Sequence, residues 1–325
     1  MTSRSIGARV RVTLVAVTWL VAAASCGGNG ADSTTADESP TSNGEDPSVS
    51  GPVHEFLAID AGGPLTKDAL ASGDIDVAVL FTSSAGEAAH GWVHLVDDRG
   101  LQPAENFVPA VHESSLTPAL RRVLDMVSAS LTEPRVQEMV DGILADGELA
   151  ANTAREFVAG LEPLPPVEGE YTVGRAGFAE SELASEIYAA ALEAAGASVE
   201  RTPELGFREV YFPAIEAGDI DVMPEFVGAL LAHLGGRPTS DLTSTLEDLR
   251  ERAATRGVVI LEPAPAESKD GLYTTRETAE KHGLVTVSDL RAVKKPLRFG
   301  GPAECPQRDL CLIGLRDVYG LRFTR

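Results

Sequence analysis

Apolar and polar positions follow the same pattern in two stretches that lie far apart in the chain. Residues 69–81 read ALASGDIDVAVLF and residues 214–226 read AIEAGDIDVMPEF. Each copy predicts a short helix ending at a left-handed glycine, an acidic turn, and an apolar run typical of a strand. Phe81 and Phe226 close these runs, at the strand ends where open α/β sheets hold their ligands. The pattern predicts two similar α/β lobes that offer aromatic rings to a shared cleft, although helix-glycine-strand junctions also arise by chance.

The rest of the pattern divides the folded part of the chain, roughly residues 54–325, into two α/β stretches. Residues 117–131 carry apolar side chains at helical spacing behind a Thr-Pro start, and a second amphipathic helix follows from Glu133. The segment LEPLPPVEGE, at 161–170, then interrupts the pattern as a stiff surface connector. Beyond it a new succession of strands and helices begins, and a chain of this length suits two lobes better than one core.

The first residues predict export rather than structure. Residues 1–25 combine three arginines, a short apolar run and small residues, as in a secretory signal peptide. Cys26 follows Ala-Ala-Ser in the manner of a lipobox and is predicted to be the lipidated first residue, although Ala23 stands where such boxes usually carry Leu. Residues 26–53 are small and polar, which favours a disordered tether.

Charge and motif content narrow the possible functions. The chain has 49 acidic and 27 basic residues, so its net charge of −22 disfavours nucleic acid and anionic membranes and tolerates a cationic ligand. No GxSxG, HExxH, P-loop or GxGxxG motif is present, and nothing in the sequence indicates an enzyme or a cofactor. His90 and His94 have helical spacing but lack a nearby acid, so we expect no metal site there.

Two smaller features have structural interpretations. In each Asp-x-Asp pair of the repeated stretch, we expect the first Asp to lie in the turn and the second to meet backbone N–H groups. Cys305 and Cys311 lie close together in CPQRDLC, and in an exported protein this spacing predicts a local disulfide that positions Arg308.

Several segments together resemble the substrate-binding proteins of glycine betaine, choline and osmoprotectant ABC importers. They are VGRAGFAESELASEIYAAALEAAG, FREVYFPAIEAGDIDVMPEFVGALLAHLGG, FGGPAECPQRDLCLIGLRDVYGL and DAGGPLTKDALASGDIDVAVLF with the following GWVHLVDDRGLQPAENFVPAV. The resemblance covers nearly all of 54–325. It implies an α/β, two-lobe, type II periplasmic-binding-protein-like fold with a hinge and an inter-lobe ligand cleft.

The blocks stand in the opposite order from the family's, so the resemblance implies a circularly permuted chain whose original ends are joined by 161–170. On this mapping one lobe is split into 54–91 and 268–325, and 92–267 forms the continuous lobe. The crossings near Gly91 and Ala266–Lys269 would form the hinge. The alternative is a tandem duplication that lost its outer halves and completes its lobes only with another molecule.

The resemblance also implies ligand-binding residues. A quaternary ammonium is held by cation–π contact with aromatic rings, and a betaine carboxylate by a fixed guanidinium. On the family's motifs, Phe226 and Phe81 match cage aromatics, Arg308 matches the arginine and Asp270 a polar residue of the site. Tyr273, next to Leu272, is the ring that a small shift would bring into the cage.

The sequence departs from the family at several positions of the site. Leu272 stands where an aromatic is expected, Ala229 replaces a threonine and Ala176 a lysine, and RGLQPAEN supplies no ring. An altered or weakened specificity is therefore expected.

These implications give a non-enzymatic, lipid-anchored binding protein on the outer face of the cytoplasmic membrane. It would deliver a small zwitterionic or cationic osmolyte to an ABC permease and its ATPase, as a monomer and without a cofactor. The alternative is a degenerate member of the family that acts as a sensor or interaction module.

Overall fold

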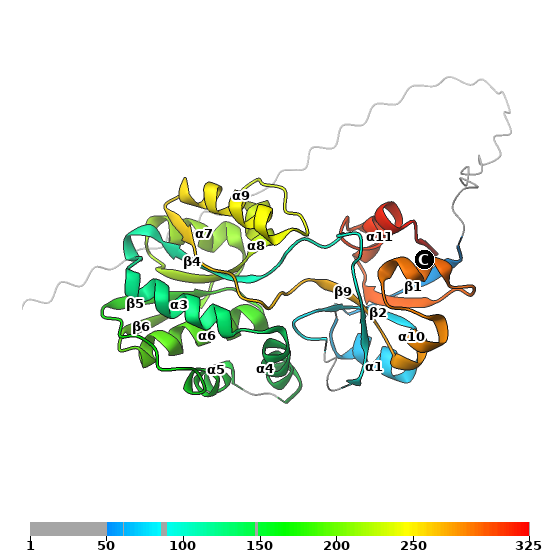
Figure 1. Ribbon diagram of the computed structural model, residues 1–325, viewed down its shortest axis with the longest axis horizontal. Helices are drawn as coiled ribbons and strands as arrows, with labels where there is room; N and C mark the ends of the chain where they lie inside the picture. Colours follow the sequence, from blue (N-terminus) through cyan, green and yellow to red (C-terminus); the bar gives the residue numbers. More distant parts are fainter. Residues whose placement is uncertain (1–50, 61, 86–89, 147–148, 325) are drawn as a thin grey trace, which may run out of the picture. The chain divides into compact units, whose positions relative to one another are not determined.

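The computed structural model describes residues 51–60, 62–85, 90–146 and 149–324 (Figure 1). Within them two separate β-sheets each carry their own helices, and we call these units the six-stranded lobe and the five-stranded lobe. The predicted signal peptide, Cys26 and most of the predicted tether lie outside the described residues. No helix in the described part of the chain is both long and apolar enough to cross a membrane.

The sheet of the six-stranded lobe has the strand order β11-β1-β10-β2-β9-β3. The first four strands run parallel, whereas β9 is antiparallel to both β2 and β3. The first and last strands of the chain are neighbours, with His54 opposite Phe323. The strands are β1 (Val53–Ile59), β2 (Val77–Phe81), β3 (Val93–Leu95), β9 (Asp270–Thr274), β10 (Arg298–Pro302) and β11 (Arg322–Thr324).

The sheet of the five-stranded lobe has the order β6-β5-β7-β4-β8. Strand β5 is parallel to β6 and β7, and β4 is antiparallel to β7 and β8. The strands are β4 (Phe107–His112), β5 (Glu170–Arg175), β6 (Ser198–Glu204), β7 (Val222–Phe226) and β8 (Val258–Ile260).

The helices divide between the lobes according to the strands that they follow. The six-stranded lobe contains α1 (Pro64–Ser72), α10 (Arg276–His282), α11 (Leu312–Tyr319), and the 3₁₀ helices η2 (Val287–Ala292) and η3 (Cys305–Gln307). The five-stranded lobe contains η1 (Glu113–Ser115), α3 (Pro118–Ser130), α4 (Glu133–Asp146), α5 (Ala150–Ala159), α6 (Ala179–Ala194), α7 (Arg208–Ala217), α8 (Val227–His233) and α9 (Leu242–Ala254).

The repeated stretch forms the predicted element in both lobes. Helix α1 ends at Gly73 with φ of 78°, and α7 ends at Gly218 with φ of 76°. At each end the backbone N–H of the glycine donates to a carbonyl of the last helical turn. This satisfies a carbonyl that has no partner within the helix. The strands β2 and β7 then end at the two predicted phenylalanines.

The second aspartate of each repeat fixes the start of its strand, as expected. Asp76 accepts a hydrogen bond from the backbone N–H of Arg298 at 2.8 Å, and Asp221 from that of Thr172 at 2.7 Å. Each donor lies at the start of a neighbouring strand, so the carboxylate joins two strands of the same sheet. These aspartates are structural groups.

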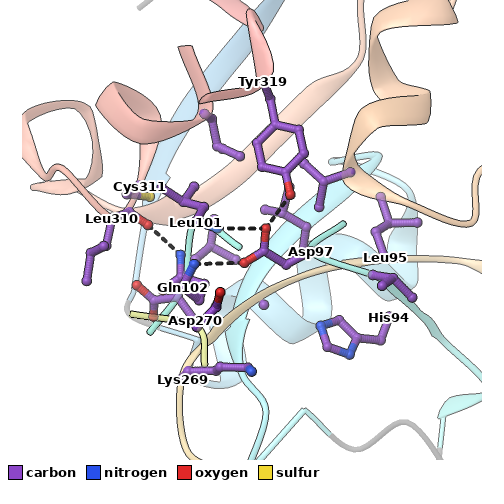
Figure 2. A pocket seen from close by; sticks show the side chains of 17 residues that line it. His94, Leu95, Asp97, Leu101, Gln102, Lys269, Asp270, Leu310, Cys311 and Tyr319 are labelled. Carbon is purple, nitrogen blue, oxygen red and sulfur yellow. Dashed lines mark hydrogen bonds between the residues drawn. The ribbon is translucent and has the colours of Figure 1, made fainter. Parts of the chain in front are cut away.

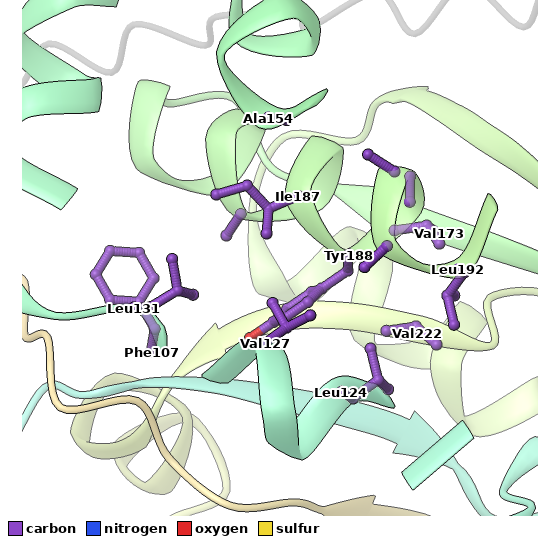
Figure 3. Close-up of a cluster of buried hydrophobic side chains, with 14 of the residues drawn as sticks. Phe107, Leu124, Val127, Leu131, Ala154, Val173, Ile187, Tyr188, Leu192 and Val222 are labelled. Carbon is purple, nitrogen blue, oxygen red and sulfur yellow. The ribbon is translucent and has the colours of Figure 1, made fainter. Parts of the chain in front are cut away.

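The large core of the five-stranded lobe lies between its sheet and helices α3 to α6. Figure 3 shows Tyr188 of α6 packed among Leu124 and Val127 of α3 and Val222 of β7. These side chains are buried because α3 and α6 each place their apolar stripes toward the sheet. The core holds the sheet in place, so the residues at its strand ends have fixed positions.

The lobe boundary expected near Gly91 is wrong in this structure. Strand β3 pairs with β9, with His94 opposite Tyr273, so residues 93–95 belong to the six-stranded lobe. The chain leaves that lobe later, where Asn106 pairs with Glu267 and Phe107 N–H donates to the carbonyl of Ala266. A strand of three residues carries too short a pattern to indicate which sheet it joins.

Candidate functional site

The six-stranded lobe contains a cavity of about 300 Å³, which we call the first cavity (Figure 2). It lies over one face of β2, β9 and β3, beside α11 and the segment 96–102. Its lining combines leucine and valine side chains with a few polar groups, as small-molecule sites do. The polar side chains are those of His94, Asp97, Gln102, Ser240, Lys269, Asp270 and Tyr319.

Asp97 in this cavity is saturated with hydrogen bonds. Its carboxylate accepts from the backbone N–H groups of Leu101 at 3.0 Å and Gln102 at 2.7 Å, and from the hydroxyl of Tyr319. The side-chain amide of Gln102 donates to the carbonyl of Leu310 at 2.6 Å. Asp97 therefore ties the 97–102 turn to α11 and has little capacity left for a ligand.

Asp270 has no such partners. It is the first residue of β9 and lies opposite Phe81 of β2, so the two side chains share one face of the sheet. Its carboxylate has no hydrogen bond or ion pair among the described residues, although it lines the cavity. Burial raises the pKa of Asp270, the charge of Arg308 acts against this rise, and Glu304 adds to it. Asp270 is thus a desolvated carboxylate available to a cation.

The other titratable groups of the cavity do not neutralise Asp270. The ammonium of Lys269 forms an ion pair with Glu267 at 2.5 Å. Burial lowers the pKa of His94, and the charge of Lys269 lowers it further, so the imidazole is uncharged at neutral pH. The cavity presents a negative charge at Asp270.

Tyr273 does not contribute a ring to this site. Side chains alternate along a strand, so Tyr273 lies on the opposite face of β9 from Asp270 and Leu272. It is 0 % exposed, in a core cluster with Leu70 of α1, and its ring stacks on His94 at a centroid distance of 4.7 Å. The prediction of Tyr273 as a cage residue is wrong here, and Leu272 lines the cavity at the position where an aromatic was expected.

Arg308 lies next to the first cavity but not in its lining. Cys305 and Cys311 form the disulfide that the spacing predicts, and Arg308 follows the short η3 helix inside this loop. Its guanidinium contacts Glu304 at 3.0 Å, and the side chain is 52 % exposed. Arg308 is thus close enough to Asp270 to affect its pKa, and it can turn toward a ligand.

A second cavity, of about 480 Å³, lies in the five-stranded lobe. It is formed where β5 meets α6 and where β6 meets α7, two strand-to-helix junctions at neighbouring strand ends. Ala176 and Ala229, two of the departures from the family pattern, both line it. The full lining is Ala176, Gly177, Phe178, Glu204, Gly206, Phe207, Arg208, Glu209, Tyr211, Ala229 and His233.

Phe226 ends β7 as predicted but is largely covered. Its ring lies 4.7 Å from that of Phe107 and 5.9 Å from that of Phe178, centroid to centroid. Phe226 is 7 % exposed, whereas Phe178 is 44 % exposed. The ring surface in this region is therefore that of Phe178, and neither Phe81 nor Phe226 lines either cavity.

An ion pair between Arg208 and the buried Glu225 lies at the second cavity, and Arg208 is part of the lining. Arg208 donates from Nε to the carboxylate of Glu225 at 3.0 Å and from a terminal nitrogen at 2.8 Å, and the hydroxyl of Tyr211 donates to it at 2.7 Å. Glu225 is almost fully buried, so the charge of Arg208 is matched inside the lobe. The sequence did not indicate this network, because Arg208 and Glu225 meet only when α7 packs beside β7.

The fold and the two cavities define a two-lobe α/β binding protein. The chain belongs to the family of the substrate-binding domain of ABC-type glycine betaine transport systems, whose model matches residues 53–160 and 169–325. The unmatched residues between these ranges are the proline-rich connector. This is a family of binding domains and not of enzymes.

Solved binding proteins share low similarity with the chain. An ancestral arginine-binding protein bound to arginine is 12 % identical with a TM-score of 0.30, and the match covers 66 % of this chain and 64 % of that one. An oligopeptide ABC transporter substrate-binding domain from Bacillus anthracis is 11 % identical with a TM-score of 0.32, covering 66 % and 53 %. The chain thus spans about half to two thirds of their lengths, and likeness at this level supports no argument about its ligand.

Proposed function

We propose that the protein is the solute-binding component of an ABC importer for a quaternary-ammonium osmoprotectant of the glycine betaine, choline or carnitine class. Membership of the family supports the role in import. The observation that carries the cationic ligand is Asp270, a desolvated carboxylate without a partner among the described residues, in a cavity lined mainly by apolar side chains.

The first cavity suits a compact cation with apolar substituents. A quaternary ammonium donates no hydrogen bonds, so it gains from a nearby negative charge and from apolar walls. Val79, Leu95 and Leu272 supply such walls around Asp270. Phe81 shares the face of Asp270 and is proposed to bring its ring against the bound cation.

The carboxylate of a betaine needs a separate partner, and we assign it to Arg308. The guanidinium forms an exposed ion pair with Glu304, which is weak and can be exchanged for a ligand carboxylate. Choline has no carboxylate, so its binding does not use this group.

The role in import implies a location and partners. The protein acts outside the cytoplasmic membrane, anchored through Cys26 and delivering its ligand as a monomer to a permease with its ATPase. The paired crossing segments at Asn106 and Glu267 join the lobes, and ligand binding shifts the lobe equilibrium that the permease reads.

Calorimetric titration of the protein with glycine betaine, choline, carnitine and proline betaine tests this proposal. We expect heat of binding for at least one of them and none for free glycine. If none of the four ligands gives heat of binding, although circular dichroism shows that the chain is folded, the osmoprotectant assignment is overturned. Asp270→Asn is expected to weaken choline binding at the first cavity.

A further inference from the structure

Side chains of the two lobes contact each other directly at α1 and α4, outside the lining of both cavities. Lys67 of α1 forms an ion pair with Asp141 of α4 at 3.1 Å. One helical turn earlier in α4, the side-chain amide of Gln137 donates to the backbone carbonyl of Thr82 at 2.7 Å. Figure 1 shows α1 and α4 facing each other, with one helix in each lobe. These two contacts therefore join the six-stranded lobe to the five-stranded lobe.

A third contact between the lobes is made by the next residue, Ser83. Its hydroxyl donates to the carboxylate of Glu180, in the first turn of α6, at 2.8 Å. It also lies 2.9 Å from the hydroxyl of Ser268, in the segment where the chain crosses between the lobes. Ser83 is 0 % exposed and Thr82 is buried as well, although polar segments that follow a strand usually lie at the surface. The end of β2 is thus in contact with the opposite lobe.

We propose that these three contacts hold the lobes in a closed arrangement through the protein's own side chains, and that they raise ligand affinity without touching the ligand. We call them the clasp: Lys67–Asp141, Gln137–Thr82 and Ser83–Glu180. The partners in each pair belong to different lobes, so rotation of the lobes apart about the crossing segments separates all three pairs. None of the six residues lines a cavity, so they act on a ligand only through the positions of the lobes.

The apparent affinity of a two-lobe binding protein depends on how often its lobes are closed. Its dissociation constant equals the intrinsic constant divided by the fraction of closed molecules. The clasp joins protein groups to protein groups, so it contributes whether or not a ligand is bound. Less of the ligand's binding free energy is then used to close the lobes.

The polar character of the clasp makes closure reversible. Lys67 and Asp141 are 19 % and 27 % exposed, so water screens their attraction less than at an open surface. When the lobes part, each polar group exchanges its partner for water, and one such contact changes an equilibrium by only about two- to tenfold. Three contacts of this kind favour the closed form and still allow the lobes to open for a ligand.

Small-angle X-ray scattering of the full chain, with no ligand added, tests the clasp directly. Lys67→Met and Gln137→Met each remove one contact and keep a side chain of similar length. Each should increase the radius of gyration, and the double variant should increase it further. Exchange of the two charges, Lys67→Asp with Asp141→Lys, should restore the radius of the unaltered chain. Arg256→Met is the matched control, because it removes an ion pair with Glu216 at 2.8 Å inside the five-stranded lobe and should leave the radius unchanged.

Calorimetric titration with choline is the second measurement, and this arm rests on the proposed function. Each single variant should weaken choline binding by about two- to tenfold, whereas Arg256→Met should not. If the radii increase and choline affinity stays unchanged in every variant, the proposed effect of the clasp on affinity is refuted.

Ser83→Ala removes only a hydroxyl, so it keeps the test decisive if circular dichroism shows that the double variant is unfolded. It should also increase the radius of gyration. Unchanged radii in both Ser83→Ala and Lys67→Met overturn the clasp. If the radii increase as expected but choline gives no heat with the unaltered chain, the clasp stands and the osmoprotectant assignment fails, so the two failures are distinguished.

Discussion

Asp97 and Asp270 show how two carboxylates of one cavity acquire different roles. Asp97 accepts hydrogen bonds from two backbone N–H groups and from Tyr319, and these bonds hold the 97–102 turn in place. Asp270 lies at the start of a strand, where burial removes water and no described group replaces it. The sequence shows two aspartates beside apolar runs, and only the contacts around each tell them apart.

The raised pKa of Asp270 predicts pH-dependent choline binding at the first cavity. In the proposed mode choline pairs with the ionised carboxylate, so its affinity should fall as the pH is lowered through the pKa of Asp270. Because that pKa lies above the usual aspartate range, near 4, the fall should begin at a higher pH than for an exposed aspartate. Calorimetric titrations with choline between pH 4 and 8 measure this dependence.

The matching variant is Asp270→Asn, which should weaken this binding by about ten- to a hundred-fold and remove its pH dependence. An unchanged pH profile in the asparagine variant would assign the titration to another group and contradict the role of Asp270.

At the scale of elements, the two copies of the helix-glycine-strand unit provide an internal comparison. Gly73 and Gly218 have nearly the same left-handed φ, which side chains other than glycine rarely adopt. A Cβ at Gly73 would meet nothing within 4 Å, whereas a Cβ at Gly218 would lie 3.1 Å from Nε2 of His112. The His112 ring is held by a hydrogen bond from Nδ1 to the carbonyl of Ile215 at 2.9 Å.

Alanine at these glycines should therefore destabilise the protein unequally. Gly73→Ala should lower the free energy of unfolding by about 1 kcal/mol, the cost of left-handed backbone. Gly218→Ala carries the same cost plus displacement of His112, so its effect should be larger. Urea unfolding of both variants makes the comparison, and equal losses would contradict the crowding at His112.

Glu105 is a second titratable residue of interest, and it lies in the segment where the chain passes from one lobe to the other, next to Asn106. Its carboxylate accepts from the backbone N–H of Ala229 at 3.0 Å at the start of α8, and its carbonyl accepts from Ser268 on the other crossing. Burial raises the pKa of Glu105 to about 7, against the hydrogen bond from Ala229 and the charge of Arg208, with Glu225 adding to the rise. Glu105 therefore joins the crossing to the helix that follows Phe226.

A raised carboxyl pKa makes the folded state favour the protonated form. Below about 4.5 Glu105 is protonated in both states, and between about 4.5 and 7 only the unfolded chain ionises it. Its contribution to the free energy of unfolding should thus decline as the pH rises through this window, by on the order of 3 kcal/mol. Glu105→Gln keeps an acceptor for Ala229 and should remove this part of the slope in urea unfolding at pH 4 to 8. Parallel curves for the two chains would refute it.

At the scale of the whole molecule, the sequence predicts what is local and misses what depends on neighbours. The glycine caps, the roles of Asp76 and Asp221 and the disulfide follow from short motifs, and all are present. The sheet of β3, the burial of Tyr273 and the covering of Phe226 depend on which elements pack together, which periodicity does not encode. One feature of the sequence could have pointed to Phe178 and Phe207 of the second cavity. Each directly follows a glycine and precedes a helix, and so does not lie on the helix's apolar face.

The last prediction concerns the first and last described strands, which are neighbours in one sheet. The six-stranded sheet takes strands from both ends of the chain, and β1 pairs in parallel with β11 from Val53↔Arg322 to Glu55↔Thr324. This register places Thr324 about two residues along and one strand across from Val53, on the order of 8 Å. Ends that lie so close can be joined by a short link, and the connector 161–170 can be opened instead.

We therefore predict that a rearranged chain, residues 166–324, a short Gly/Ser linker and residues 51–165, folds to the same structure and binds choline with the affinity of the original. Its free energy of unfolding should be close to that of the original, because the strand pairings and the core contacts are the same in both chains. The rival origin, a duplication that completes its lobes with another molecule, predicts a sedimentation mass that falls on dilution together with loss of structure. Both sheets are formed here within one chain, so we expect a monomer at every concentration, for the original and the rearranged chain alike.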